Sequence, residues 1–256
     1  MLPNRLRFSA AIGLLALGLA CSGEKQAAPP SAPPPGALRV DPAKTGTIAG
    51  RVVFEGTPPE NRPLPLSADP FCQREHPNGA TFETYVVDKG GLENVFVYVK
   101  DGLGNYYFDP PAGPAKLDQK GCIYHPHVIG VRAGQPIEIS NSDNTLHNIH
   151  ALPETNREFN FGQHLAGQKD TKTFTAAEVL IPFKCDAHNW MNAYVGVVTH
   201  PYFAVSAGEG KFELKDVPAG TYTIEAVHEK LGRQTESVTL GEKDSKDLTF
   251  TFKATS

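Results

Sequence analysis

Short runs of alternating apolar and polar residues recur along the chain, and none of them keeps the period of a helix. Each run is typical of a β-strand with one buried face, and glycine- and proline-rich turns separate the runs. Strands are predicted at residues 47–54, 82–87, 95–99, 122–131, 136–141, 179–185, 193–198, 210–214, 216–226, 236–240 and 247–252. Strands at such short spacing predict an all-β fold built as sandwiches.

The first 45 residues follow a different pattern. Arg5 and Arg7 precede an apolar run that ends at Ala20, which is too short to span a membrane and predicts a signal peptide over 1–20. Cys21 comes next in a segment similar to the lipobox of bacterial lipoproteins, which implies a lipidated first residue. Gly18 stands where that motif usually has leucine, so cleavage at a neighbouring signal-peptidase site is the alternative.

A proline- and alanine-rich stretch fills residues 21–45 and predicts a tether, because it has too few apolar side chains to form a core. We therefore expect a protein held at a membrane by a lipid anchor in the bacterial cell envelope, facing the periplasm. Loss of Arg5 and Arg7 with the signal peptide lowers the formal net charge from −4 to −6. With no basic tract, the composition argues against a nucleic-acid partner.

The candidate chemistry lies in the loop Cys185–Met191, which has the spacing C-x2-H-x2-M. A thiolate, an imidazole and a thioether form a soft set of ligands that suits copper in both oxidation states, with methionine as a weak axial ligand. The chain has two methionines, Met1 and Met191, so the mature protein keeps one, in this loop. We expect Cys185, His188 and Met191 to hold one type 1 copper ion.

Two further cysteines, Cys72 and Cys122, allow two interpretations. In an oxidising compartment they most simply form a disulfide. The alternative is a second metal site, because His76 follows Cys72 by four residues and His125 follows Cys122 by three.

The segment 114–199 resembles a cupredoxin, in the motif Asn141-x-Asp143-x3-His147-Asn148 and in the Cys185–Met191 loop. Residues 46–113 and 200–253 resemble a carboxypeptidase regulatory-like (transthyretin-like) β-sandwich, most clearly at residues 210–212 and 217–222. The resemblances imply a Greek-key cupredoxin sandwich inserted into a second, discontinuous sandwich.

The cupredoxin resemblance also assigns roles to individual residues. It implies that His147 is the fourth copper ligand and that the backbone N–H of Asn148 donates to the Cys185 sulfur. Asn141 and Asn148 are expected to support the ligands by hydrogen bonds. His188, with its neighbours Asn189 and Trp190, is expected to form the surface through which the electron passes. The alternative for Trp190 is that it shields the site. Asn189 stands where related loops often have proline. The resemblance therefore does not decide how His188 is held.

The resemblance implies a protein that transfers single electrons between redox protein partners, without a small-molecule substrate and without enzyme activity. The alternative is a lipoprotein that buffers or delivers copper, although such proteins usually expose several Met or His ligands. A copper oxidase or a nitrite-reductase-like enzyme would need a second copper site, and the sequence shows no clear His-x-His partner set. A fourth interpretation gives the function to the regulatory-like sandwich, as a binding module for carbohydrate or envelope protein.

Overall fold

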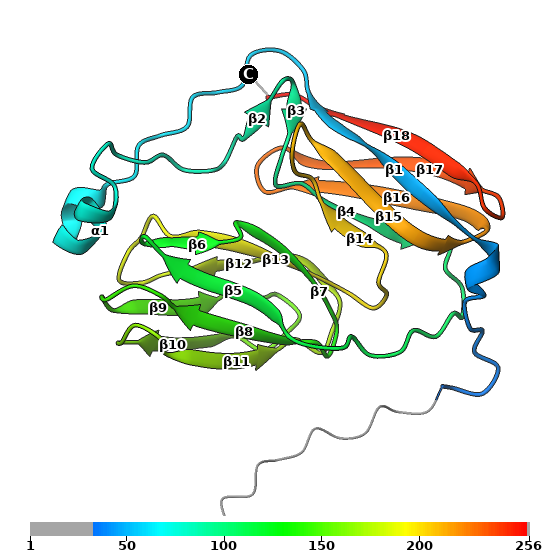
Figure 1. Ribbon diagram of the computed structural model, residues 1–256, viewed down its shortest axis with the longest axis horizontal. Helices are drawn as coiled ribbons and strands as arrows, with labels where there is room; N and C mark the ends of the chain where they lie inside the picture. The colour runs from blue at the N-terminus through cyan, green and yellow to red at the C-terminus, as the bar shows by residue number, and fades with distance from the viewer. Residues whose placement is uncertain (1–32, 255–256) are drawn as a thin grey trace, which may run out of the picture. The chain divides into compact units, whose positions relative to one another are not determined.

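Four β-sheets make up most of the regular structure in the computed structural model, which describes residues 33–254. The described residues belong to one compact unit. This nearly all-β architecture confirms the predicted fold class (Figure 1). The predicted signal peptide, Cys21 and the first part of the tether lie outside the described residues.

Two sheets enclose one core, in which Ile48, Val97 and Phe250 are buried. The first sheet has the order β15-β1-β3-β2, with β18 pairing parallel to β1, so that the first and last of these strands lie side by side (Figure 1). Its strands are β1 (Thr45–Phe54), β2 (Val87–Asp88), β3 (Gly91–Leu92), β15 (Lys211–Pro218) and β18 (Ser245–Phe252). The second sheet has the order β14-β4-β16-β17. Its strands are β4 (Phe96–Asp101), β14 (Phe203–Val205), β16 (Gly220–His228) and β17 (Gly232–Leu240).

The other two sheets take all their strands from the middle of the chain and enclose a second core. One has the order β10-β9-β12-β13-β7, from β7 (Val128–Arg132), β9 (His147–Ala151), β10 (Phe159–Gln163), β12 (Glu178–Lys184) and β13 (Asn192–Val198). The other has the order β11-β8-β5-β6, from β5 (Ala115–Lys120), β6 (Ile123–His125), β8 (Pro136–Asn141) and β11 (Lys169–Thr173). The pairs β13–β7 and β5–β8 are parallel, as crossovers between the two sheets of a sandwich produce. The domain boundaries assigned from the sequence remain a prediction.

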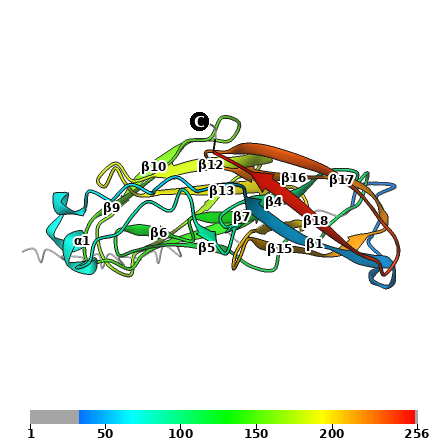
Figure 2. The same cartoon turned by 90° about the horizontal axis from the view of Figure 1, so that it is seen from above.

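A six-residue helix, α1 (Pro70–Glu75), lies beyond the end of the second core, near β6 and β9 in both views (Figure 1, Figure 2). It starts with a capping aspartate, Asp69, followed by proline at the first helical position, two features that favour a helix start. The sequence pattern did not predict it, because a helix of this length is too short to show a 3.6-residue period. Two 3-10 turns, η1 (Pro42–Lys44) and η2 (Leu66–Ala68), complete the helical structure of the described residues.

Three expectations about local structure need correction. Most of the strand predicted at 82–87 is absent, since only Val87 enters β2. Instead, the side-chain amide of Asn61 pairs with both the N–H and the C=O of Tyr85 (2.9 Å each), replacing a strand partner. Residues 159–174, where the polar sequence led to no predicted strand, carry β10 and β11. Part of the predicted tether also contacts the folded body: the N–H of Leu38 donates to the C=O of Asn105 (3.1 Å).

A smaller apolar cluster joins the two halves of the described chain. Phe96 and Tyr98 of β4 and Val227 of β16 pack with Val128 of β7 and Val198 of β13. Because this cluster is buried, the two pairs of sheets form a continuous apolar contact. Within the described residues, no helix is long and apolar enough to span a membrane.

Candidate metal centre

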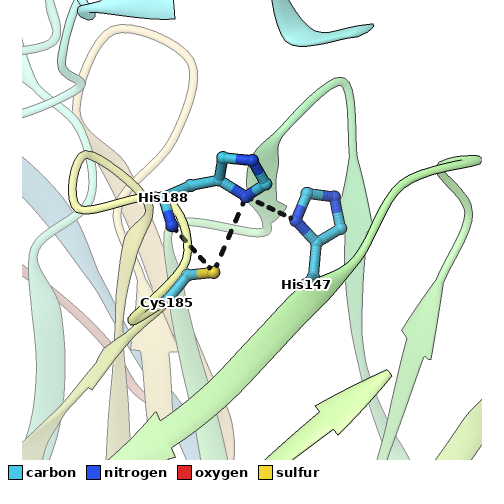
Figure 3. Close-up of side chains that lie close together, drawn as sticks. All are labelled: His147, Cys185 and His188. Atoms are coloured by element: carbon cyan, nitrogen blue, oxygen red, sulfur yellow. Dashed lines mark hydrogen bonds between the residues drawn. The ribbon is translucent and has the colours of Figure 1, made fainter. Parts of the chain in front are cut away.

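Three potential metal ligands come together at one end of the second core (Figure 3). His147 is the first residue of β9, and Cys185 immediately follows β12. His188 lies in the turn between β12 and β13, and Figure 3 shows its ring between Cys185 and His147. The turn closes through backbone hydrogen bonds from Met191 N to His188 O (2.9 Å) and from Cys185 N to Met191 O (3.2 Å). This closure explains the two-residue spacings of the loop.

The donor atoms are close together and shielded from water. His147 Nδ1 lies 3.1 Å from His188 Nδ1, which in turn lies 3.8 Å from Cys185 Sγ. The exposed fractions of the three residues are 0% for His147, 1% for Cys185 and 5% for His188. Among the described cysteines, Cys185 is the free one. Two nitrogens and one sulfur therefore face a common, water-excluded point.

Two backbone N–H groups point at the Cys185 sulfur. The N–H of Asn148 and the N–H of His188 each donate to Sγ at 3.3 Å. Such donors stabilise a thiolate relative to a thiol and restrict the position of the sulfur. Asn148 also fixes the loop from its side chain, since its Oδ1 accepts from Asp186 N at 3.0 Å.

The outer nitrogen of each imidazole faces a carboxylate. Nε2 of His147 lies 2.8 Å from Oδ2 of Asp143, and Nε2 of His188 lies 3.2 Å from Oδ2 of Asp69. An ionised carboxylate can only accept, so both Nε2 atoms carry the ring proton and donate it. In the neutral rings both Nδ1 atoms are then unprotonated, with their lone pairs directed towards each other and towards Sγ.

The charges of the site agree with this arrangement. Burial opposes ionisation of Asp143 and Asp69, but hydrogen bonds from the histidines and from backbone N–H groups outweigh it and lower the pKa of both carboxyls. Burial also disfavours the charged form of His188, yet its contacts with Cys185 and Asp69 raise its pKa. The two ionised carboxylates and the Cys185 sulfur therefore favour positive charge at the rings.

Asn141 shapes the segment that leads to His147. Its side-chain Nδ2 donates to Thr145 O (3.0 Å) and Gln163 O (3.1 Å), and its Oδ1 accepts from Asp143 N (2.8 Å). These bonds hold Asp143 where it meets His147. Asn141 therefore acts on the site through Asp143 and not by direct contact with a ligand.

Two of the three residues expected at the electron-transfer surface are buried. Asn189 is exposed, but His188 and Trp190 are buried, and Asp69 covers the outer nitrogen of His188. The Trp190 ring packs on His188 with centroids 5.0 Å apart, and its Nε1 donates to Cys122 O at 3.1 Å. Trp190 therefore shields His188, one of the two roles expected for it, and the passage of the electron through this region stays a prediction.

The disulfide prediction is confirmed. Cys72 of α1 and Cys122 of the turn between β5 and β6 are bonded, with Cα atoms 5.6 Å apart. The alternative of a second metal site at these cysteines is therefore excluded in this state. The Nε2 of His76, named for that alternative, contacts the C=O of Gly121 at 2.6 Å instead.

Asp69 was missed by the sequence reasoning, and Asp143 appeared there only as part of a motif. The pair Asp69-Pro70 is a recognisable helix start, but nothing in the sequence connects it with His188, 119 residues further along.

Met191 is buried in the core of this half of the chain, beside Trp190.

The chemistry of the donors fits a copper ion. Two imidazoles and one cysteine sulfur, with a methionine in the same loop, match a His₂Cys set with a weak axial methionine. Two Nδ1 lone pairs 3.1 Å apart repel each other unless a proton or a metal ion lies between the donors. His147, Cys185 and His188, with Met191, are the residues that would hold the ion.

No protein-family model and no curated protein sequence matches the chain. Among solved structures, it is similar to a Cu-containing nitrite reductase from Thermus scotoductus SA-01, with 19% identity over 37% of this chain and 24% of that one, at a TM-score of 0.31. It is similar to a purple cupredoxin from Nitrosopumilus maritimus, with 20% identity over 32% of this chain and 98% of that one, at a TM-score of 0.29. A Cu(I) form of an amicyanin mutant matches with 22% identity over 34% of this chain and 84% of that one, at a TM-score of 0.30.

These similar structures are cupredoxins or contain copper by their names, and this chain spans about a quarter of the nitrite reductase. The first of them corrects one expectation. The sequence led us to expect a protein without enzyme activity, whereas the nitrite reductase is an enzyme. A non-enzymatic role is therefore no longer part of the interpretation.

Proposed function

We propose that this protein binds one type 1 copper ion through His147, Cys185, His188 and Met191 and transfers single electrons between redox proteins. The observation that carries the proposal is the convergence of two imidazole Nδ1 atoms and the Cys185 sulfur at a buried point. When bound there, copper supplies a one-electron change between its two oxidation states.

The residues of the chain prepare the site for this role. The N–H groups of Asn148 and His188 hold the sulfur, and Asp143 and Asp69 hold the rings. Asn148 lies in β9, His188 lies in the closed Cys185–Met191 turn, and the two carboxylates come from outside both, so the donors are held from several sides and should keep their places in both oxidation states. Burial of the site excludes water. Water molecules would otherwise bind the copper ion in one oxidation state and dissociate from it in the other.

Copper delivery or buffering is the alternative function. It requires ready release of the ion, whereas the three donors are buried and their outer hydrogen bonds are satisfied. This burial favours retention. A chelator of modest affinity should therefore remove copper from the folded protein slowly, and rapid transfer would support delivery instead.

The proposal includes a place in the bacterial cell envelope, with the body held at a membrane by lipid on Cys21 and a redox protein as partner. The sequence around Arg5, Arg7 and Cys21 supports this, and the disulfide between Cys72 and Cys122 suits an oxidising compartment. Expression with a radiolabelled fatty acid should label the protein and not its Cys21→Ser variant.

Absorption spectroscopy of the copper-loaded full chain tests the function. We expect an intense visible band from charge transfer between the thiolate and Cu(II), with one copper per chain by metal analysis. Cys185→Ser should abolish the band, while His164→Ala, a change at an exposed histidine, should keep it. A colourless complex, or a protein that takes up zinc and not copper, would contradict the proposal.

A further inference from the structure

Asp69 stands apart from the other residues around the metal centre because it belongs to neither of the two sheets that carry them. It precedes α1, in the segment between β1 and β2, two strands of the first sheet. Its side chain is 23% exposed, and its two oxygens have separate partners. Oδ1 accepts from the N–H groups of Phe71 (2.7 Å) and Cys72 (3.2 Å), which caps the helix.

The second oxygen, Oδ2, faces the metal centre. It accepts from His188 Nε2 at 3.2 Å and from the hydroxyl of Thr145 at 3.4 Å. Without the helix cap, the carboxylate would be free to rotate towards water. The cap fixes Oδ1 and therefore directs Oδ2 at the imidazole. One side chain thus connects the helix start to a ligand ring.

The helix itself is held against the site. Cys72, three residues after Asp69, is bonded to Cys122, and the sulfur of Cys72 lies within 4.8 Å of the ligand atoms of Asp69 and His188. Trp190 packs on the His188 ring and donates to the C=O of Cys122. The disulfide therefore fixes both the carboxylate and the aromatic ring that contact His188.

We infer that Asp69 is a positioning residue of the metal centre, supplied by the segment around α1. By accepting the Nε2 proton, it holds His188 in the tautomer whose Nδ1 is free and directed towards Cys185 Sγ and His147 Nδ1. Asp143 does the same for His147 from within the sandwich. The identity of the ion in this inference rests on the proposed copper function. The tautomer of His188 does not.

The substitution Asp69→Asn separates the two roles of this side chain. Asparagine caps helices as well as aspartate does, so Oδ1 keeps its bonds to Phe71 and Cys72. The amide NH₂ then takes the place of Oδ2 and cannot accept the Nε2 proton. Asp41→Asn is the matched control, because Asp41 also caps a short helical turn, η1, through Oδ1 and does not contact the site.

The first readout uses the copper-free full chain labelled with ¹⁵N-histidine, at a pH at which the His188 ring is neutral. Long-range ¹H–¹⁵N spectra should show the proton on Nε2 in the wild type and in Asp41→Asn. In Asp69→Asn, the population with the proton on Nδ1 should rise. Loss of a bond to a ligating histidine should also weaken Cu(II) binding by about 10–100-fold in a chelator competition.

Two results would overturn the inference. One is a wild-type His188 that carries its proton on Nδ1, which needs no variant to observe. The other is a folded Asp69→Asn protein with wild-type tautomer and wild-type copper affinity. Asp69→Ser, which also caps the helix, replaces Asp69→Asn if the latter does not fold. A wild type that binds no copper would refute the proposed function and leave the tautomer result to decide the inference.

Discussion

At the scale of single residues, His200 shows how a buried imidazole outside the metal centre ties stability to pH. It lies between β13 and β14, its Nδ1 accepts from Tyr202 N at 3.2 Å, and its ring stacks on Tyr202. Burial, together with the charge of Arg132, lowers the pKa of His200 to about 4. The folded protein therefore holds His200 neutral, while the unfolded chain protonates it below its ordinary pKa.

The sign of the pH effect follows directly. A depressed pKa in the folded state gives stability that is present above the unfolded value and is lost as the pH falls through the folded value. For His200 the loss spans pH ~6.5 to ~4 and amounts to about 3 kcal/mol at most. Urea unfolding at several pH values should show a shallower decline in His200→Gln than in the wild type. His164→Gln should keep the wild-type decline, and equal slopes in all three proteins would show that His200 does not contribute.

At the scale of elements, α1 and its disulfide form a cover over the metal centre. The helix has six residues, too few to be stable alone, so the Asp69 cap and the Cys72–Cys122 bond hold it in place. The bond spans 50 residues, and closure of a loop of that length restricts the unfolded chain by about 4 kcal/mol in the chain-entropy account.

Removal of the disulfide should therefore affect both stability and access. The double variant Cys72→Ser, Cys122→Ser should lose about 2–4 kcal/mol of unfolding free energy. In the copper-free protein, Cys185 should react faster with a thiol reagent, because the freed helix no longer covers His188. Chemical denaturation and the alkylation rate measure the two effects. An unchanged alkylation rate would mean that the cover is held by its other contacts.

At the scale of the whole described molecule, two glycines allow the two halves of the chain to meet. Gly130 of β7 and Gly196 of β13 are register partners, and the ring of Phe96 from β4 lies over both. A Cβ at Gly196 would lie 2.6 Å from the Phe96 ring, which is too close for any side chain. The contact between the halves thus depends on the absence of side chains at these positions.

Gly196→Ala should destabilise the protein by about 1–3 kcal/mol, the usual cost of overpacking. Gly113→Ala is the control, since a Cβ there would meet no heavy atom within 4 Å. Denaturant unfolding compares the two variants. If the two halves of Gly196→Ala unfold in separate steps, the Phe96 contact couples them in the wild type. An unfolding curve for Gly196→Ala equal to that of the wild type would show that Phe96 moves aside without cost.

How much of this could be predicted depends on the range of each interaction. The strands β8, β12 and β13 follow from local alternation, and the Cys185–Met191 spacing follows from a turn closed by its own backbone bonds. Sequence alone therefore determined the all-β class and the ligand loop, which depend on residue type and on neighbours along the chain. For Cys72 and Cys122 it left two interpretations, and the structure decided for the disulfide.

Only the tertiary structure decided how His188 is held. The sequence left this undecided, because the contact comes from Asp69, 119 residues away, at the start of a helix too short to show a period. The missing strand near Tyr85 has the same cause, since the amide of Asn61, 24 residues earlier, satisfies the backbone there. A sequence pattern reports which face of a segment is apolar, but it does not report which distant polar group meets a given hydrogen-bond donor.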